Sequence, residues 1–117
     1  MNFDSYQELA NRTAKPMTMQ GNLLHAALGL SGEVGEFVDT VKREFVYGQE
    51  LDVENLKEEL GDILWFVALA CETLHANMRD IAAANIDKLA TRYPGTYTDH
   101  HAAERADKAP VPSGVEA

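Results

Sequence analysis

Two short acidic clusters have the residue types and the spacing most suited to chemistry. Residues 33–36 read Glu-Val-Gly-Glu, and residues 58–62 read Glu-Glu-Leu-Gly-Asp. Because positions i and i+3 share one face of a helix, Glu33 pairs with Glu36, and Glu59 pairs with Asp62. Neither cluster contains Cys or His. Oxygen-only ligands indicate a hard cation such as Mg²⁺ or Mn²⁺.

The surroundings of the acid pairs indicate that they face protein rather than water. Apolar residues recur at helical spacing around both clusters, and each acid pair lies along one edge of the resulting stripe. In the second segment, the line through Glu59 and Asp62 continues into Phe66 and Leu69. Four convergent carboxylates would repel one another and lose hydration, a penalty that a bound cation removes. The alternative is two solvated helix edges that happen to be acidic.

Hydrophobic periodicity predicts four main helices. The first is expected from about Asp4 and is ended by Lys15-Pro16, with a loop at residues 14–21. The others are expected from about Asn22 to Phe45, from a cap at Asp52 to about His75, and from about Met78 to Tyr93. Asp4 and Gln7 have the spacing of a capping box. Glycines at 29, 32 and 35 each cost about 1 kcal/mol in a helix interior, which indicates a packing or site requirement. The alternative is a break near Gly32.

The predicted fold class is all-α, a four-helix bundle, because no segment alternates at strand spacing. We expect one domain at 1–95 and a mobile or loosely docked tail at 96–117, where periodicity is lost. Trp65 lies off the main apolar stripe, which favours a subunit contact or, second, a wall for an aromatic ligand. The thin core and Trp65 predict a homodimer or homotetramer that completes the core and the site.

Composition narrows the possible partners. The chain has 117 residues, enough for one domain, and 45% of them are hydrophobic. Ten basic and nineteen acidic side chains give a net charge of −9, which argues against nucleic acid or an anionic membrane as a partner.

Cys71 is the only cysteine and lies on the apolar stripe, so we expect a core side chain rather than a nucleophile. Without a signal-peptide pattern or a membrane-length apolar run, a cytoplasmic location is expected.

Together these segments resemble the MazG-like nucleoside triphosphate pyrophosphohydrolases, whose all-α superfamily includes the dimeric dUTPases and the dCTP pyrophosphatases. The resemblance spans about residues 20–95 and is strongest for compact single-domain members, such as those carried by phages. It rests on Glu-x-x-Glu followed about twenty residues later by Glu-x-x-Asp, on the stretches His25–Glu36 and Glu58–Trp65, and on the run Asn85-x-x-Lys88-x-x-x-Arg92-Tyr93-Pro94.

The resemblance implies Mg²⁺-dependent hydrolysis of the α–β phosphoanhydride of nucleoside or deoxynucleoside triphosphates. The products would be a nucleoside monophosphate and pyrophosphate. Glu33, Glu36, Glu59 and Asp62 would bind Mg²⁺, with Mn²⁺ as a substitute. Water would be activated by the metal or by a carboxylate base, which would be Glu36, Glu59 or the neighbouring Glu58. The alternative for Glu58 is a solvated side chain.

A second set of residues would contact the substrate. Lys88 and Arg92 would bind phosphate oxygens, Asn85 would hydrogen-bond sugar or phosphate, and Tyr93 could stack or donate nearby. His25 would line the base pocket, with ordinary packing as its alternative. For Lys88 and Arg92 the alternative is a solvated last helical turn, where cations suit the helix dipole. A non-catalytic oligomerisation or partner-binding module, or an alarmone hydrolase with the same metal site, also remains open.

Overall fold

The computed structural model describes residues 1–108, and every regular element in this range is helical. The elements are α1 (Phe3–Asn11), α2 (Met19–Tyr47), α3 (Val53–Thr73), α4 (Met78–Arg92), α5 (Asp99–Glu104) and the short 3₁₀ helix η1 (Ala106–Lys108). The predicted all-α class is confirmed. The chain forms two compact units, Met1–Arg79 and the part that begins at Asp80. Within the described range, no helix is long and apolar enough to cross a membrane.

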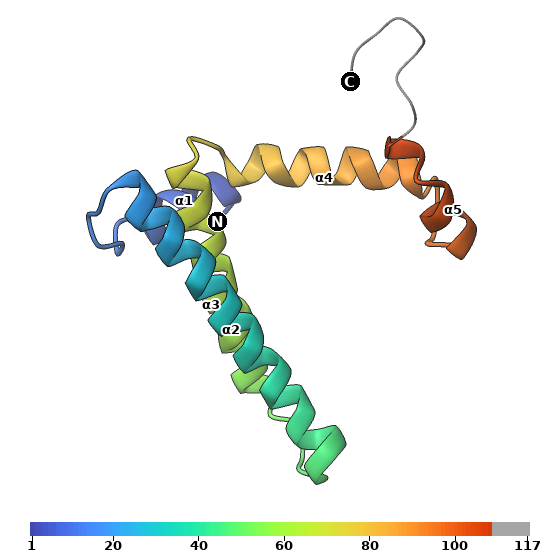
Figure 1. Ribbon diagram of the computed structural model, residues 1–117, viewed down its shortest axis with the longest axis horizontal. Coiled ribbons are helices and arrows are strands. Elements are labelled where there is room, and N and C mark those ends of the chain that lie inside the picture. The colour runs from blue at the N-terminus through green and yellow to red at the C-terminus, as the bar shows by residue number, and fades with distance from the viewer. Residues whose placement is uncertain (109–117) are drawn as a thin grey trace, which may run out of the picture. The chain divides into compact units, whose positions relative to one another are not determined.

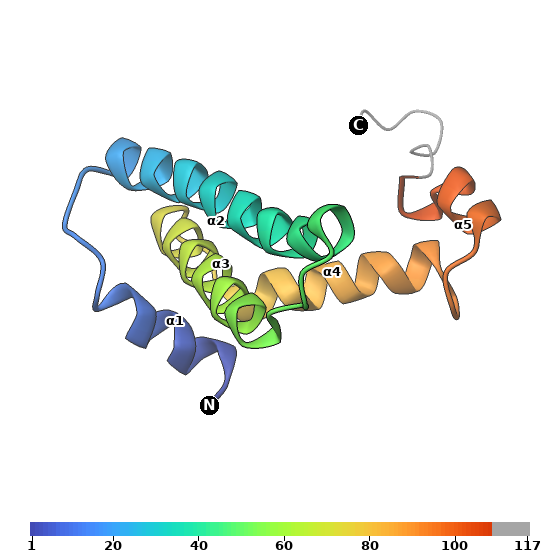
Figure 2. The same cartoon turned by 90° about the horizontal axis from the view of Figure 1, so that it is seen from below.

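The first unit is organised around α2 and α3, which run antiparallel and side by side (Figure 1). Helix α1 packs on the other side of α3 (Figure 2). Gly48 ends α2 with a φ of 66°, a left-handed conformation that glycine adopts without a steric penalty. As predicted, Asp52 caps α3, and its carboxylate accepts a hydrogen bond from Asn55 N at 3.1 Å. Helix α2 continues through Gly32, so the alternative of a break there is wrong.

Both of the first two helices begin earlier than the periodicity predicted. Asn2 caps α1, with its Oδ1 accepting from the backbone N–H three residues on at 2.9 Å. Asp4 is therefore not the cap, and it forms an ion pair with Arg79 at 2.7 Å. Thr18 caps α2 in the same way at 3.0 Å. Short polar side chains satisfy the free N–H groups of a first turn, so these caps set both starts.

The hydrophobic core is small and is centred on the contact between α1 and α3. Its buried members are Ala10, Ala68, Cys71 and Met78, with Tyr6, Trp65 and Val67 packed against them. Burial raises the pKa of the Cys71 thiol, as expected of a core side chain. Along α2 and α3, Val34, Val38, Leu60 and Leu64 remain 40–57% exposed. The described chain therefore leaves much of its predicted apolar stripe uncovered.

Trp65 has the second packing surface that the sequence predicted, but α1 of the same chain supplies it. Its indole Nε1 donates to the carbonyl oxygen of Ala10 at 3.2 Å and to Thr13 Oγ1 at 2.8 Å. The ring is half-buried rather than fully exposed. A buried indole N–H needs an acceptor, and the last turn of α1 and the turn after it each provide one. These hydrogen bonds therefore stabilise the packing of α1 on α3.

In the second unit, Asp107 binds the end of α4. Its carboxylate forms two bonds with the Arg92 guanidinium, at 2.6 Å to Nε and 3.0 Å to Nη2. The side chain of Asp107 is 4% exposed. Helices α5 and η1 were not predicted, because elements of six and three residues are too short to establish a period. The rest of the predicted tail, residues 109–117, lies outside the described residues.

Acid is expected to loosen the α5–η1 segment. The hydrogen bonds from Arg92 hold the pKa of Asp107 below its ordinary value. A group with a lowered folded-state pKa stabilises the fold above its unfolded pKa, and this contribution is lost as the pH falls through the folded value. Hydrogen-exchange protection of residues 99–108 should therefore fall in acid. Asp107→Asn should show the same loss at neutral pH.

Glu104→Gln is the matched control for this experiment, because it removes only an exposed contact with His100 at 3.1 Å. Its exchange protection should resemble that of the wild type. Unchanged protection in Asp107→Asn would mean that the Arg92 pair does not hold the segment.

Candidate functional site

The four predicted ligands, Glu33, Glu36, Glu59 and Asp62, lie on the paired helices α2 and α3. Desolvation is the largest cause that raises the pKa of Glu33, followed by the charges of Glu36 and Asp62. The charge of Glu59 raises it further. A raised pKa is expected for a carboxyl group that has other carboxylates nearby. Helix α2 packs on α3, and hollows lined from both helices bring together acidic side chains that are up to 29 residues apart in sequence.

Two hollows divide these carboxylates into cross-helix pairs. Glu36 and Glu59 line a hollow of about 510 Å³, and Glu33 and Asp62 line another of about 360 Å³. Among residues 1–108, no group of three or more Asp, Glu, His or Cys side chains has the geometry to hold a metal ion. Like charges favour rotamers that separate them unless a cation lies between them. The four carboxylates do not form a ready-made coordination shell, and their assignment as ligands stays a prediction.

Glu59 is the most deeply buried of the four, at 7% exposure. Its Oε1 accepts hydrogen bonds from Thr40 Oγ1 at 3.1 Å and from Asn55 Nδ2 at 3.0 Å. Its Oε2 is buried without a hydrogen-bond partner in residues 1–108, and so is Oε2 of Glu33. A buried oxygen without a donor costs free energy, which coordination to a cation would remove. The donor set therefore fits a hard divalent cation.

Thr40 and Asn55 are not among the site residues that the sequence predicted, although their spacing from the acidic residues is a recognisable pattern. Thr40 follows Glu36 by four residues, and Asn55 precedes Glu59 by four. Positions four apart share a helix face, so both polar residues continue the acidic lines into the helix interface.

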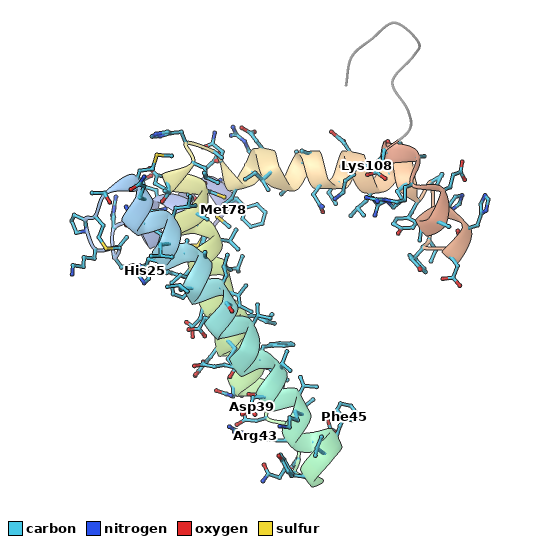
Figure 3. The ribbon with its side chains drawn as sticks, in the orientation of Figure 1. His25, Asp39, Arg43, Phe45, Met78 and Lys108 are labelled. Atoms are coloured by element: carbon cyan, nitrogen blue, oxygen red, sulfur yellow. The ribbon has the colours of Figure 1, made fainter. Side chains whose placement is uncertain are left out.

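Aromatic side chains form one wall of the smaller hollow. Trp65 and Phe66 line it, with ring centroids 5.0 Å apart in an edge-to-face arrangement. His25 is exposed on α2 (Figure 3). The centroid of its ring lies 5.4 Å from that of Phe66 and 6.1 Å from that of Trp65. A Cβ at position 29 would collide with the Phe66 ring, which explains Gly29. His25 therefore belongs to the aromatic cluster beside Glu33.

Two glycines of α2, which have no side chains, form part of the lining of the larger hollow. Gly32 and Gly35 line it, and a Cβ at either position would meet nothing within 4 Å. Asp39 and Arg43 extend the lining toward the end of α2 and form an ion pair at 2.9 Å (Figure 3). No packing contact within residues 1–108 requires glycine at 32 or 35. Their effect is to leave room next to Glu36.

The remaining predicted site residues are at the surface or on the second unit. Glu58 is exposed on α3. Asn85 and Lys88 are exposed on α4, and their spacing with Arg92 places all three on one helix face. Arg92 is held by Asp107 and lies 6.0 Å from the ring centroid of Tyr93. Tyr93 is half-buried, with its ring centroid 5.1 Å from that of Tyr97.

Residues 22–97 match the family model described as the MazG nucleotide pyrophosphohydrolase domain. The matched range contains both acidic clusters and the Asn85–Tyr93 run. The Gene 37 protein of Mycobacterium phage L5 is 32% identical over 103 residues, which cover 79% of this chain and 89% of the phage protein. No solved structure matches the chain.

Proposed function

Because the chain belongs to the MazG nucleotide pyrophosphohydrolase domain family, we propose that it hydrolyses nucleoside or deoxynucleoside triphosphates to a nucleoside monophosphate and pyrophosphate. One structural observation carries the proposal. Two buried carboxylate oxygens, Glu33 Oε2 and Glu59 Oε2, have no hydrogen-bond partner in residues 1–108, and their side chains line the two hollows that also contain Asp62 and Glu36. This donor chemistry suits a divalent cation, which is a common partner of phosphate groups in enzymes.

Glu33, Glu36, Glu59 and Asp62 would hold Mg²⁺, or Mn²⁺ in its place. The bound cation would neutralise charge on the triphosphate and polarise the phosphorus under attack. The reaction consumes one water, whose oxygen bonds to phosphorus as the α–β anhydride bond breaks. One carboxylate takes the proton of that water, and the candidates are Glu36, Glu59 and the exposed Glu58.

Residues of α4, together with Tyr93 directly after it, would bind the substrate. Lys88 and Arg92 donate to phosphate oxygens, Asn85 hydrogen-bonds sugar or phosphate, and Tyr93 stacks or donates nearby. The bidentate pairing of Arg92 with the Asp107 carboxylate supports this role, because phosphate presents a similar pair of oxygens to a guanidinium. On substrate binding, Arg92 would exchange the Asp107 carboxylate for a phosphate group of the nucleotide.

The base would lie against the aromatic cluster of His25, Trp65 and Phe66. The rings contact one another edge to face, and two of them line the hollow that contains Glu33 and Asp62. An aromatic wall beside the proposed cation ligands suits a planar ring that is linked to a charged triphosphate.

Self-association is part of the same proposal. Val34 and Val38 on α2, together with Leu60 and Leu64 on α3, give the paired helices exposed apolar side chains. Several such side chains on one pair of helices exceed the scattered apolar residues that are normal on a monomer surface. A homodimer or homotetramer would cover them.

A panel of nucleoside and deoxynucleoside triphosphates tests the proposed reaction. With Mg²⁺, the purified chain is expected to release equal amounts of pyrophosphate and nucleoside monophosphate from at least one of them. EDTA should abolish the release, and Mg²⁺ or Mn²⁺ should restore it. Release of inorganic phosphate, hydrolysis of an alarmone alone, or no product from any nucleotide would contradict the proposal.

A further inference from the structure

We propose that Thr40 and Asn55 are positioning residues that hold one oxygen of Glu59, so that its other oxygen is directed to a divalent cation. The inference deepens the proposed function and rests on it for the identity of the bound group. It assigns a role to two residues outside the four carboxylates, one on each of the paired helices.

The geometry of the network uses almost every donor that the two side chains have. Asn55 Nδ2 donates to Glu59 Oε1 at 3.0 Å and to Thr40 Oγ1 at 3.1 Å. The Thr40 hydroxyl has one hydrogen and lies 3.1 Å from two acceptors, Glu59 Oε1 and the carbonyl oxygen of Glu36. When this hydrogen is donated to Oε1, Thr40 joins Glu59 of α3 to α2 at a position one turn from Glu36, another proposed ligand.

The network is anchored at both ends. Thr40 is 4% exposed and cannot rotate freely within the α2–α3 contact. Asn55 lies in the first turn of α3, where its own backbone N–H donates to the capping carboxylate of Asp52. Both donors thus reach the carboxylate from fixed backbone positions, which restricts its rotation.

A purely structural role leaves one feature of this arrangement unexplained. Most buried polar groups in folded proteins have hydrogen-bond partners, so an unpartnered oxygen inside a buried network calls for an explanation. Here both donors meet at Oε1, while Oε2 is buried with no hydrogen-bond partner in the described part of the chain. Side chains that orient a metal-binding carboxylate show this division, with one oxygen held and the other left for the ion.

Mn²⁺ binding in the absence of nucleotide tests the inference, with the free ion measured by electron paramagnetic resonance on the full chain. Thr40→Val keeps the shape of the side chain but removes the hydroxyl, and Asn55→Ala removes the amide. Each is expected to weaken Mn²⁺ binding by about tenfold or more, as for other residues that orient metal ligands. Thr40→Ser restores the hydroxyl and should return the affinity to near the wild-type value.

Thr73→Val is the matched control. Thr73 is also buried on one of the paired helices, and its hydroxyl donates only to the Leu69 carbonyl oxygen at 2.7 Å. Thermal unfolding in EDTA reports any loss of fold in each variant. If Thr40→Val does not fold, Asn55→Ala decides the question, because Asn55 is only half-buried.

Wild-type Mn²⁺ affinity in folded Thr40→Val and Asn55→Ala would overturn the inference, and so would an equal loss in Thr73→Val. The result is separable from the proposed reaction. A wild type that binds Mn²⁺ through this network but hydrolyses no nucleotide would remove the reaction and keep the inference. If the wild type hydrolyses nucleotides but neither substitution changes the Mn²⁺ affinity, the proposed reaction stands and the role of Thr40 and Asn55 is rejected.

Discussion

In the Glu59→Gln variant, pyrophosphate release is expected to fall by about 10²- to 10³-fold, the usual cost of removing one electrostatic group from an active site. The substitution is nearly isosteric. The glutamine oxygen can still accept from Thr40 and Asn55, while the amide nitrogen replaces the unpartnered Oε2. The change therefore removes charge and one cation ligand without removing the network.

The same variant should be at least as stable as the wild type in EDTA, because a neutral amide is easier to bury than an unpaired carboxylate. Adding Mg²⁺ should raise the melting temperature of the wild type by mass action and leave the variant almost unchanged. Glu54→Gln is the control on the same helix, since the Glu54 side chain is 83% exposed and, within residues 1–108, pairs only with Lys57. Full activity in Glu59→Gln would remove Glu59 from the proposed site.

Alanine at two glycines of α2 should have opposite effects on stability. Gly29→Ala is expected to lower the free energy of unfolding by about 1–3 kcal/mol, because the new Cβ collides with the Phe66 ring. Gly35→Ala should raise it by about 0.5–1 kcal/mol, since its Cβ meets open space and alanine favours the helix. Urea denaturation of the two variants and the wild type measures both changes.

Activity should separate from stability at Gly35. Its added methyl group would enter the hollow beside Glu36, so Gly35→Ala is expected to lose activity while it gains stability. Gly61→Ala on α3 is the control, because its Cβ also meets nothing within 4 Å and Gly61 lines neither of the two hollows. A Gly35→Ala variant with full activity would show that the open backbone is not needed for substrate.

Much of the fold could be predicted because its signals are local. The four main helices follow from apolar periodicity, and the cap at Asp52 follows from the preference of aspartate for that position. Spacing alone also placed Glu33 with Glu36 and Glu59 with Asp62 on shared helix faces. The helix starts were missed because Asn2 and Thr18 act before the apolar pattern begins.

The parts that escaped prediction depend on contacts between distant residues. The clustering of His25 with Trp65 and Phe66 requires the packing of α2 on α3, and the Arg92–Asp107 pair joins residues 15 apart through a turn without a clear sequence signal. The cross-helix pairing of the carboxylates into two hollows likewise depends on how α2 and α3 are aligned. No spacing rule within one helix specifies these features.

The contact between Trp65 and α1 gives the chain an internal optical reporter. Trp65 is the only tryptophan, so all indole emission originates at the junction of α1 and α3. Detachment of α1 would expose the indole to water and shift its emission to longer wavelengths even while the other helices stay folded. Because the same ring borders the hollow of Glu33 and Asp62, a quencher that enters this hollow would dim the signal without shifting it.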